Sequence, residues 1–551
     1  MLRSRFLRCA VASAAALAIS LTVSPATPAV AQARPSAPAS FPGFASFHHV
    51  KIPGANGIKL DAATWIHRDG TPRPAIVMPG PWTQFGWRTY TVMASKYALA
   101  GYNVLAYSAR GFGSSEGGAE GGGPLDVQDG SKALDHLIAQ APGRTTKVGF
   151  TGLSYGSGLS QLIAAQDPRV DAVAALSTWG DLGEAFYENR TRHLASVRAL
   201  QTVKGNARLS ARTQRMFSDL LANRNIPQAL EWAKQRSPKT YLKQLNKRRV
   251  PVFYGQAWHE TLFPSNQSLK TFNRLTGPKR IDVSIGDHAG PEMTGMAGLP
   301  NHVAKDAKRW FDRFLKGERN GIDTEGQVNS QVMWKYWPWV RETRPNWGAF
   351  TERTERLNLT GPGGGRADGA LSSAALRPAA PSTGWRMPFT SGTDTTASVG
   401  GNIVFVAGYK EMVGLPKTYR TDTISRKHAA VWTSAPMEAT TRLRGTPKLR
   451  LTYTATTAQS TIIAHLFDVD AHGKAHIITH APFTSPGGRA GRPVTADISL
   501  QAAAYDVPTG HRLMLVVDTK DAFYGDANGA GGQITVTSPK GRPSYLDVPT
   551  G

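Results

Sequence analysis

The feature that most constrains this chain is a stretch in which an apolar strand passes into a helix with no loop between them. Residues 148–163 read VGFTGLSYGSGLSQLI, where the first part is typical of a buried strand and the last part of a helix. Between them stands the pentapeptide Gly152-Leu153-Ser154-Tyr155-Gly156. The two glycines let the backbone turn sharply and let strand and helix approach closely. Such a turn pushes the side chain of Ser154 outward and predicts a nucleophile elbow; an ordinary strand-to-helix turn that happens to hold a serine is the alternative.

The pattern around this turn predicts a parallel sheet. Continuous apolar strands that alternate with helices are typical of a parallel sheet covered on both faces. Two earlier runs, HHVKIP and IKLDAATWIH, predict a leading antiparallel pair. The six alternating runs are RPAIVMPG, YNVLAYSAR, KVGFTGL, VDAVAALSTWG, VPVFYGQAW and RIDVSIG.

The alternation breaks over residues 181–248, which read as helical with no strand of their own. Residues 190–249 hold 15 Lys and Arg against two acids, Asp219 and Glu231. We expect a helical cap over the active edge of the sheet. An ordinary solvated helical insertion would explain the charge equally well.

The composition changes after Trp347. Gly, Ser, Thr and Pro become frequent, helical periodicity disappears, and runs such as KLRLTYTAT, TIIAHLFDVD and HRLMLVVDT alternate with turn residues. This pattern predicts an all-β domain over 347–551, folded as a two-sheet jelly roll. The stretch DVDAHG resembles the opening of a calcium loop, but the closing position is Thr479, which favours a hairpin turn.

The N-terminus has the composition of a secretory signal. MLRSRFLR carries three arginines and no acid, an apolar stretch follows, and small residues stand at Ala31 and Ala33. We expect a signal peptide over 1–33, a linker over 34–45 rich in Pro, Ala and Ser, and a secreted, extracellular protein. The apolar stretch is shorter than the ~20 residues that span a bilayer, so we expect no stable membrane insertion.

Cysteine content and charge narrow the chemistry and the partners. The only cysteine, Cys9, lies inside that signal, so the mature chain has no thiol for disulfides, nucleophilic catalysis or metal ligation. The formal charge of +25 falls to +22 without the three signal arginines. No arginine-rich run, zinc motif or repeat of stacking aromatics accompanies this charge, so nucleic acid is not an expected partner. Anionic cell-wall polymers suit a basic secreted protein better.

A serine becomes a nucleophile when a histidine takes its proton and a carboxylate orients that histidine. In α/β-hydrolases these residues follow in the order serine, acid, histidine, and the last two lie at the carboxyl ends of later strands. VPVFYGQAWHETLFP ends a strand and presents Glu260, and RIDVSIGDHAG ends the next one and presents His288. We therefore predict a catalytic triad of Ser154, Glu260 and His288.

Other residues compete for the acid role in this arrangement. Asp181 follows the preceding strand and is a rival for Glu260. Asp287 is another, although a sequence neighbour of the histidine is badly aimed to orient it. His259 adjoins Glu260 and is an alternative polar residue at that strand end.

The oxyanion of an acyl-transfer reaction needs two hydrogen-bond donors. We expect one to be the backbone N–H of Tyr155, which follows the nucleophile. The other is expected from the loop Gly80-Pro81-Trp82 after the first parallel strand. Because Pro81 has no N–H, the donor there is Trp82, through its backbone or its indole N–H.

Five motifs carry a resemblance to a known family. They are YSARGFGSSEG (107–117), GLSYG, RWFDRFLKG (309–317), TSAPMEATTRLRGTPKLRLTYTA and VPTGHRLMLVV. They resemble the cocaine-esterase and Xaa-Pro dipeptidyl-peptidase group of serine hydrolases along nearly all of the mature chain. The resemblance implies an α/β-hydrolase domain over 46–180 and 249–346, a helical cap over 181–248, and a jelly-roll (galactose-binding-like) domain over 347–551.

The chain departs from the pattern of that group at two positions. In the group a Tyr after a Pro supplies the second oxyanion donor, and the triad acid is usually Asp in a Trp-x-Asp setting. Here the corresponding residues are Pro81-Trp82 and Trp258-His259-Glu260, so Trp replaces Tyr and Glu replaces Asp. Both departures are compatible with acyl transfer.

The resemblance implies a secreted serine hydrolase that cleaves an ester or amide through an acyl-enzyme, with dipeptidyl-peptidase activity or as a carboxylic ester hydrolase without it. The expected partner is a small ester, amide or peptide. Recognition of a free amine needs carboxylates near the nucleophile, and the candidates are Asp181, Glu184 and Glu188 in WGDLGEAFYEN. They are also explained as acids at a helix start. The basic cap favours neutral or anionic acyl substrates instead.

A non-catalytic secreted protein whose jelly roll binds a polysaccharide is the alternative of a different class. The presence of Ser, acid and His in the required order argues against it. The histidines show no HExxH or other ligand spacing, and no phosphate loop or dinucleotide fingerprint occurs. We expect no metal and no cofactor.

Overall fold

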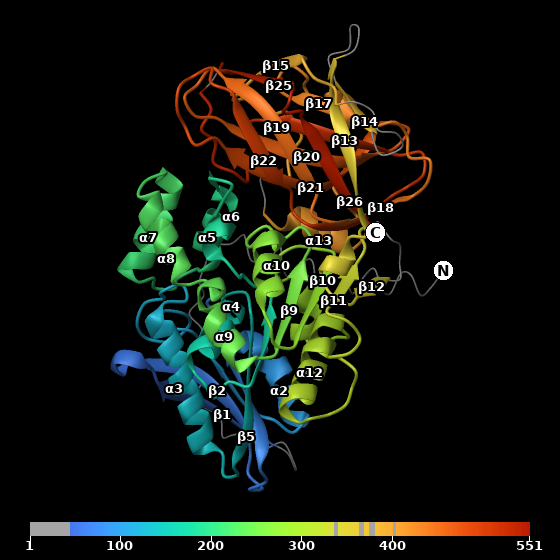
Figure 1. Cartoon of the computed structure of the whole chain (residues 1–551). Coiled ribbons are helices and arrows are strands. Elements are labelled where there is room, and N and C mark those ends of the chain that lie inside the picture. The colour runs from blue at the N-terminus through green and yellow to red at the C-terminus, as the bar shows by residue number, and fades with distance from the viewer. Residues whose placement is uncertain (1–44, 335–339, 363–368, 374–380, 400–403, 530) are drawn as a thin grey trace.

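The computed structural model describes residues 45–551, except 335–339, 363–368, 374–380, 400–403 and 530. The predicted signal peptide and almost all of the predicted linker lie outside the described residues. Figure 1 shows an α/β domain and, stacked against it, a β domain formed by residues from 347 onward. Within the described ranges we find no helix with both the length and the apolarity that crossing a bilayer requires.

The α/β domain is built on a single mixed sheet that is mostly parallel. Its strand order is β1-β2-β4-β3-β5-β6-β9-β10-β11-β12. The leading pair is antiparallel, β2 pairs antiparallel with β4, and the strands from β4 to β11 run parallel, as the six apolar runs predict. The strands are β1 (Ala45–Pro53), β2 (Lys59–His67), β3 (Arg73–Pro79), β4 (Asn103–Tyr107), β5 (Thr145–Leu153), β6 (Ala172–Leu176), β9 (Val252–Ala257), β10 (Lys279–Ser284), β11 (Val328–Gln331) and β12 (Arg341–Arg344).

Helices cover both faces of this sheet. Successive side chains of a strand point to opposite faces. In β3, Ile76 and Met78 pack with residues of α2 and α12, whereas Ala75 and Val77 pack with residues of α3 and α4. Both faces are therefore dry, which explains the continuous apolar strands. The helices of the domain are α2 (Thr91–Leu99), α3 (Pro124–Gln140), α4 (Tyr155–Gln166), α10 (Ser265–Arg274), α11 (Gly290–Met296) and α12 (His302–Leu315).

The segment between β6 and β9 is helical, apart from one hairpin that the sequence analysis did not predict. Residues Asn189 and Arg190 both have positive φ (47° and 67°), the geometry of a two-residue hairpin turn. The sequence did not predict the hairpin, because such turns usually have Gly at the second turn position and here that residue is Arg190. The elements are α5 (Leu182–Phe186), β7 (Tyr187–Glu188), β8 (Thr191–Arg192), α6 (Leu194–Val203), α7 (Ala211–Ala222), α8 (Ile226–Lys234) and α9 (Leu242–Arg248).

The described residues of the β domain form strands, short 3-10 turns and, as the one exception to the predicted all-β pattern among them, an α-helix. The three apolar runs named above form β19, β20 and β24, and DVDAHG ends β20 and forms the turn into β21, where Gly473 has φ 76°. The two-sheet jelly roll stays a prediction. The strands are β13 (Arg353–Pro362), β14 (Gly369–Ser373), β15 (Arg386–Thr390), β16 (Tyr419–Arg420), β17 (Ala430–Thr433), β18 (Thr441–Gly445), β19 (Lys448–Ala455), β20 (Thr461–Val469), β21 (Lys474–Thr484), β22 (Val494–Ser499), β23 (Ala503–Val507), β24 (Arg512–Asp518), β25 (Gln533–Thr537) and β26 (Tyr545–Thr550).

The exception is helix α13 (Val406–Met412), which lies between the β domain and the α/β domain (Figure 1). The composition after residue 347 predicts no helical element, and this prediction is wrong. The helix has seven residues, too few to show a helical period in the sequence.

Candidate active site

Ser154 lies at a strained turn between β5 and α4. Its backbone has φ 56° and ψ −117°, a conformation that a residue with a side chain rarely adopts. The turn is held because the N–H of Ser154 donates to the carbonyl of Leu176 (2.8 Å). A Cβ on Gly156 would lie 2.0 Å from the carbonyl oxygen of Pro79, so only glycine fits there. The two glycines of the pentapeptide therefore serve the close approach that the sequence predicts.

A chain of hydrogen bonds joins Ser154, His288 and Glu260. Nε2 of His288 lies 2.7 Å from Oγ of Ser154, and Nδ1 of His288 lies 2.8 Å from Oε1 of Glu260. The same carboxylate oxygen accepts the backbone N–H groups of Leu262 and Phe263 (3.1 and 3.2 Å). An oxygen that accepts these bonds requires Nδ1 of His288 to carry the proton, which leaves Nε2 free to accept from the serine hydroxyl.

The electrostatics favour a basic His288. Burial by itself would lower the pKa of His288, but the charge of Glu260 and its hydrogen bond outweigh burial and raise the pKa above the ordinary value of 6.5. The three side chains are buried, so little water screens this interaction. The arrangement can accept a proton from the serine and hold the resulting positive charge.

Asp287, the rival carboxylate next to the histidine, holds the backbone instead of the imidazole. Its Oδ1 accepts the N–H and the hydroxyl of Thr261 (2.8 and 2.9 Å) and the N–H of His288 (2.6 Å). Burial and the nearby charge of Glu260 raise the pKa of this carboxyl. Asp287 thus fastens the loop after β9 to the loop after β10.

A further buried carboxyl, Glu292, was missed by the sequence analysis. Its Oε2 accepts the hydroxyl of Ser177 (3.1 Å), and Ser177 in turn accepts the N–H of Ala289 (2.9 Å), next to His288. Burial raises the pKa of Glu292 to about 7. Its only sequence signal is a position four residues after His288, at the start of α11.

The two residues expected to donate to the oxyanion, Tyr155 and Trp82, both line the cavity that adjoins the serine. Tyr155 is the first residue of α4, and within the described chain neither its backbone N–H nor that of Trp82 has a hydrogen-bond acceptor. The indole of Trp82 does not share this position, because it donates to the carbonyl of Leu200 in α6 (2.9 Å). Of the two donors considered at Trp82, the structure therefore leaves the backbone N–H.

A small cavity of about 30 Å³ adjoins Ser154. Apart from Ser154 and Gly121, its wall is formed by aliphatic and aromatic side chains. Six of the aromatic side chains are Trp or Phe, and the seventh is Tyr155. Several come from the helical segment between β6 and β9, which therefore covers the serine. The lining residues are Trp82, Gly121, Ser154, Tyr155, Trp179, Leu182, Phe186, Leu200, Phe217, Trp232 and Phe263.

The three carboxylates proposed for amine recognition do not line this cavity. Asp181 caps α5 and pairs with Lys239 (2.8 Å), and Glu184 pairs with Lys270. Glu188 accepts the side-chain amide of Gln501 in the β domain (2.6 Å). Leu182 and Phe186 of α5 are four residues apart, share one face of the helix and line the cavity. Glu184 lies between them on the other face and reaches Lys270 instead.

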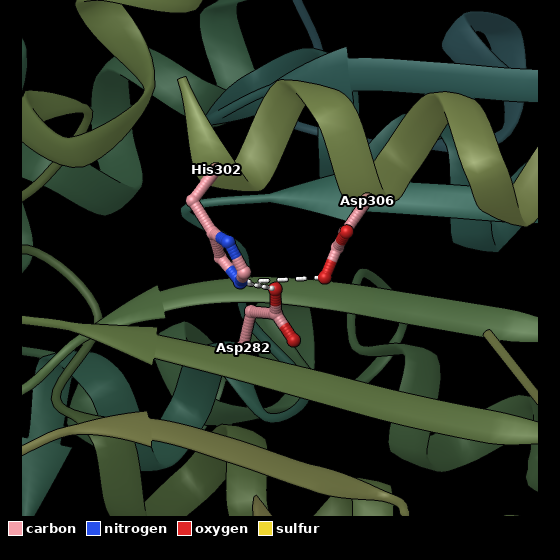
Figure 2. A group of neighbouring side chains, drawn as sticks. All are labelled: Asp282, His302 and Asp306. Carbon is pink, nitrogen blue, oxygen red and sulfur yellow. Dashed lines mark ion pairs between the residues drawn. The ribbon is translucent and has the colours of Figure 1, made fainter. Parts of the chain in front are cut away.

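One group of side chains in the α/β domain has a metal-like arrangement. Asp282 of β10 and His302 and Asp306 of α12 bring three ligand atoms within 4.8 Å of one another (Figure 2). Arg280, however, donates to Asp282 (3.0 Å) and to Asp306 (2.9 Å).

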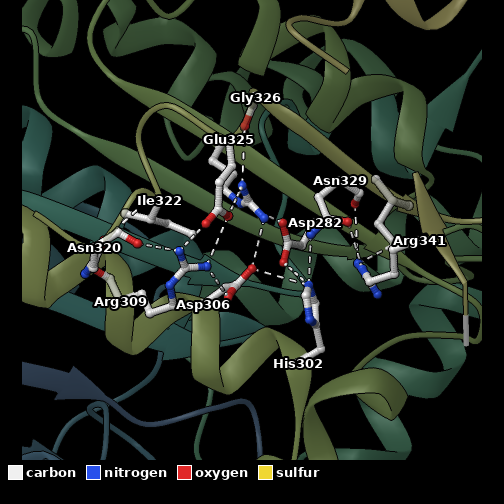
Figure 3. A network of polar contacts seen from close by, with 12 residues as sticks. Asp282, His302, Asp306, Arg309, Asn320, Ile322, Glu325, Gly326, Asn329 and Arg341 are labelled. Carbon is white, nitrogen blue, oxygen red and sulfur yellow. Dashed lines mark hydrogen bonds and ion pairs between the residues drawn. The ribbon is translucent and has the colours of Figure 1, made fainter. Parts of the chain in front are cut away.

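The same carboxylates belong to a wider network with Arg309 and Glu325 (Figure 3). Arginines already balance their charge. The group is therefore best explained as an ion-pair network that ties α12 to the sheet.

Comparison with known proteins identifies the family. Residues 56–290 match the family described as X-Pro dipeptidyl-peptidase (S15 family), and residues 320–547 match the X-Pro dipeptidyl-peptidase C-terminal non-catalytic domain. The chain belongs to the Xaa-Pro dipeptidyl-peptidase and cocaine-esterase group of serine hydrolases. A Bacillus anthracis protein assigned to the Xaa-Pro dipeptidyl-peptidases is 22% identical over 487 residues, which are 80% of this chain and 72% of the relative.

Solved structures of this group share the fold. A CocE/NonD family hydrolase from Staphylococcus aureus has a TM-score of 0.68 at 13% identity and covers 92% of this chain and 93% of its own. An α-amino acid ester hydrolase has a TM-score of 0.69 at 16% identity and covers 96% of this chain and 100% of its own. The predicted α/β-hydrolase fold is confirmed, and the chain is an acyl hydrolase by family.

Proposed function

We propose that this protein hydrolyses an ester or amide bond of a neutral, apolar acyl group through an acyl-enzyme on Ser154. The observation that carries the proposal is the hydrogen-bonded chain from Ser154 through His288 to Glu260 at a strained turn. It has the residues and the order that a serine hydrolase uses. The non-catalytic polysaccharide binder would need none of this geometry.

In the proposed reaction Oγ of Ser154 attacks the substrate carbonyl carbon while Nε2 of His288 takes the hydroxyl proton. Glu260 stabilises the imidazolium that forms. The oxyanion accepts the backbone N–H groups of Tyr155 and Trp82. As the tetrahedral intermediate collapses, His288 returns the proton to the leaving oxygen or nitrogen, and the acyl group stays on Ser154. Nε2 of His288 then takes a proton from a water molecule whose oxygen attacks the acyl carbon. As the bond between Oγ and the acyl carbon breaks, His288 returns that proton to Oγ of Ser154 and the acid leaves.

The wall of the cavity supports an apolar acyl group. Aromatic side chains surround Ser154, and an ionic group placed among them would lose its hydration without a partner. The cavity is far below the roughly 300–1,000 Å³ of ligand pockets, so binding requires the covering helices to move.

Dipeptidyl-peptidase activity is the second candidate, and the family of residues 56–290 favours it. A peptide with a free N-terminus needs an anionic anchor close to the serine. None of Asp181, Glu184 and Glu188 lines the cavity beside Ser154; the first two pair with lysines, and the third accepts a hydrogen bond from Gln501. We therefore place ester hydrolysis first.

We further propose that the mature protein is secreted and lies near anionic cell-wall polymers. The arginine-bearing apolar N-terminus supports secretion, and the formal charge of +22 that remains when the three signal arginines are subtracted from +25 supports the anionic partner. Release of the mature chain into culture medium, beginning near residue 34, is the expected result of expression with the native N-terminus.

A paired substrate screen tests the proposed reaction. Wild type and Ser154→Ala would be assayed on p-nitrophenyl esters of increasing acyl length and on Xaa-Pro-p-nitroanilides. We expect turnover of the esters by wild type alone, with kcat/KM rising with acyl length. Turnover restricted to the anilides would favour the peptidase, and equal turnover by Ser154→Ala would contradict the proposal. Ser160→Ala is the matched control, because Ser160 is a buried serine of α4, the helix that follows Ser154.

A further inference from the structure

Helix α13 of the β domain lies against the two loops that carry Glu260 and His288. It follows Phe405 and packs on α11, which begins two residues after His288. Its family region is described as non-catalytic. The contacts of α13 nevertheless reach both loops of the proposed triad.

The first contact joins Glu411 of α13 to His259. Nδ1 of His259 lies 2.7 and 2.9 Å from the two carboxylate oxygens of Glu411, and Nε2 donates to the carbonyl of Ile478 (3.0 Å). Burial would lower the pKa of His259, but Glu411 outweighs it and raises the pKa to about 9. The pair is therefore a buried charge-assisted contact at neutral pH. His259 immediately precedes Glu260, so this contact fixes the backbone that presents the proposed triad acid.

The second contact reaches the loop of the proposed base. The hydroxyl of Tyr409 donates to the backbone carbonyl of His288 (2.9 Å). The ring of Phe405 stacks on the imidazole, with centroids 6.3 Å apart and an interplanar angle of 29°. Helix α13 thus contacts the backbone of His288, and the residue that precedes the helix stacks on its ring.

The third contact is a close packing that only glycine permits. A Cβ on Gly408 would lie 2.5 Å from Cβ of Asp287. Asp287 is the carboxylate that fastens Thr261 to the backbone of His288. The helix therefore presses on the residue that joins the two loops.

We propose that α13 is a positioning element of the proposed reaction, in which Glu411, Tyr409 and Gly408 keep Glu260 and His288 aligned with Ser154. This inference rests on the proposed function of Ser154. The physical reason is that proton transfer needs the base within hydrogen-bond reach of the nucleophile, and a misplacement of about 1 Å costs about 10²-fold in rate. The β domain would then complete the active site without touching the substrate.

The test compares three variants of α13 with one matched control. Glu411→Gln removes a charge from the His259 contact, Tyr409→Phe removes one hydroxyl, and Gly408→Ala adds one methyl. Alanine is more favourable than glycine in a helix by about 1 kcal/mol. A loss of activity in Gly408→Ala would therefore come from the clash of the added methyl with Asp287 and not from a weaker helix. Glu342→Gln is the control, because Glu342 of β12 binds Arg442 and Arg444 of the β domain in another interdomain contact.

Three measurements are made on each full-length protein: kcat and KM on one good ester, the rate of fluorophosphonate labelling, and hydrogen–deuterium exchange of residues 258–263 and 286–291. We expect Glu411→Gln and Gly408→Ala to lower kcat and the labelling rate by about 10–100-fold with little change in KM, and to speed exchange in both loops. We expect a smaller loss of kcat, about several-fold, for Tyr409→Phe, the mildest change. Glu342→Gln should alter none of these.

Wild-type kcat, labelling and loop exchange in Glu411→Gln and Gly408→Ala would overturn the inference, and so would equal effects of Glu342→Gln. A wild-type protein that is not labelled at Ser154 would instead defeat the proposed function. In that case the exchange data still decide whether α13 holds the two loops. If Gly408→Ala does not fold, Tyr409→Phe and Glu411→Gln carry the test.

Discussion

Trp82 donates its indole N–H to the backbone carbonyl of Leu200, across 2.9 Å. This bond ties the loop after β3, where an oxyanion donor is expected, to helix α6 of the segment that covers the serine. The indole therefore links the loop beside the serine to the helical segment that covers it, and the backbone N–H of Trp82 remains as the proposed oxyanion donor.

Replacing Trp82 by Phe should therefore spare the chemical step. The variant keeps a ring in the cavity wall and loses one hydrogen bond, worth about 0.5–1.5 kcal/mol. We expect kcat within about threefold of wild type and a change mainly in KM, as the cover loosens. If the indole were an oxyanion donor in the working enzyme, kcat would instead fall by about 10²–10³-fold. Steady-state kinetics on one ester separate these results.

Glu260→Gln should leave the fold intact and reduce kcat by about 10³–10⁴-fold, because a neutral amide neither fixes the tautomer of His288 nor stabilises the imidazolium. Asp287→Asn is the informative partner variant, since Asp287 binds the backbone of His288 and the side chain of Thr261 but not the imidazole. Its loss should be at least tenfold smaller. The reverse order would make Asp287 the orienting acid. Circular dichroism of both variants checks that they are folded.

The pH profile should report His288 directly. The proposed base works only when neutral, so kcat/KM should rise with pH through the pKa of His288. Burial would lower that pKa, but Glu260 holds it above 6.5, and the acid limb of the profile should therefore lie above pH 6.5. In Glu260→Gln the residual activity should show a limb at lower pH. If the acid limb of the Glu260→Gln profile lies at the same pH as in wild type, then the charge of Glu260 does not raise the pKa of His288.

Glu342 should stabilise the joint between the two domains in a pH-dependent way. Burial would raise its pKa, but Arg444 and Arg442 outweigh burial and lower the pKa to about 2. A carboxyl with a lowered folded pKa stabilises fully above its unfolded value, about 4.3, and this stabilisation is lost as the pH falls through about 2. Glu342→Gln should thus lower the free energy of unfolding at pH 7 by about 1–3 kcal/mol. The difference in Tm from wild type should shrink between pH 4 and pH 2, and a constant difference would contradict this account.

The fold was predictable wherever burial on both faces leaves a continuous apolar run. The six parallel strands and the elbow at Ser154 are of this kind. Strands β11 and β12 were missed because VNSQ and RETR are short and polar, and they become strands only by pairing at the edge of the sheet. Helix α13 is held by contacts with distant residues, which no local pattern records.

In the site, Ser154, Glu260 and His288 follow from their places at the ends of strands, and the structure brings these three side chains together. The role of Trp82 did not follow, because its indole partner belongs to a helix 118 residues away. The ion pair between Glu184, a candidate for amine binding, and Lys270 did not follow from the sequence either, because Lys270 lies far along the chain. Long-range partners decide which of several plausible polar side chains faces the nucleophile.

The most direct test of the proposed active site is the labelling of Ser154. The mature protein is treated with a fluorophosphonate, digested, and mapped by mass spectrometry, together with Ser154→Ala and the control Ser160→Ala. We expect a single adduct on Ser154 in wild type and in the control, and none in Ser154→Ala. An adduct on another residue, or undiminished labelling of Ser154→Ala, would contradict the account.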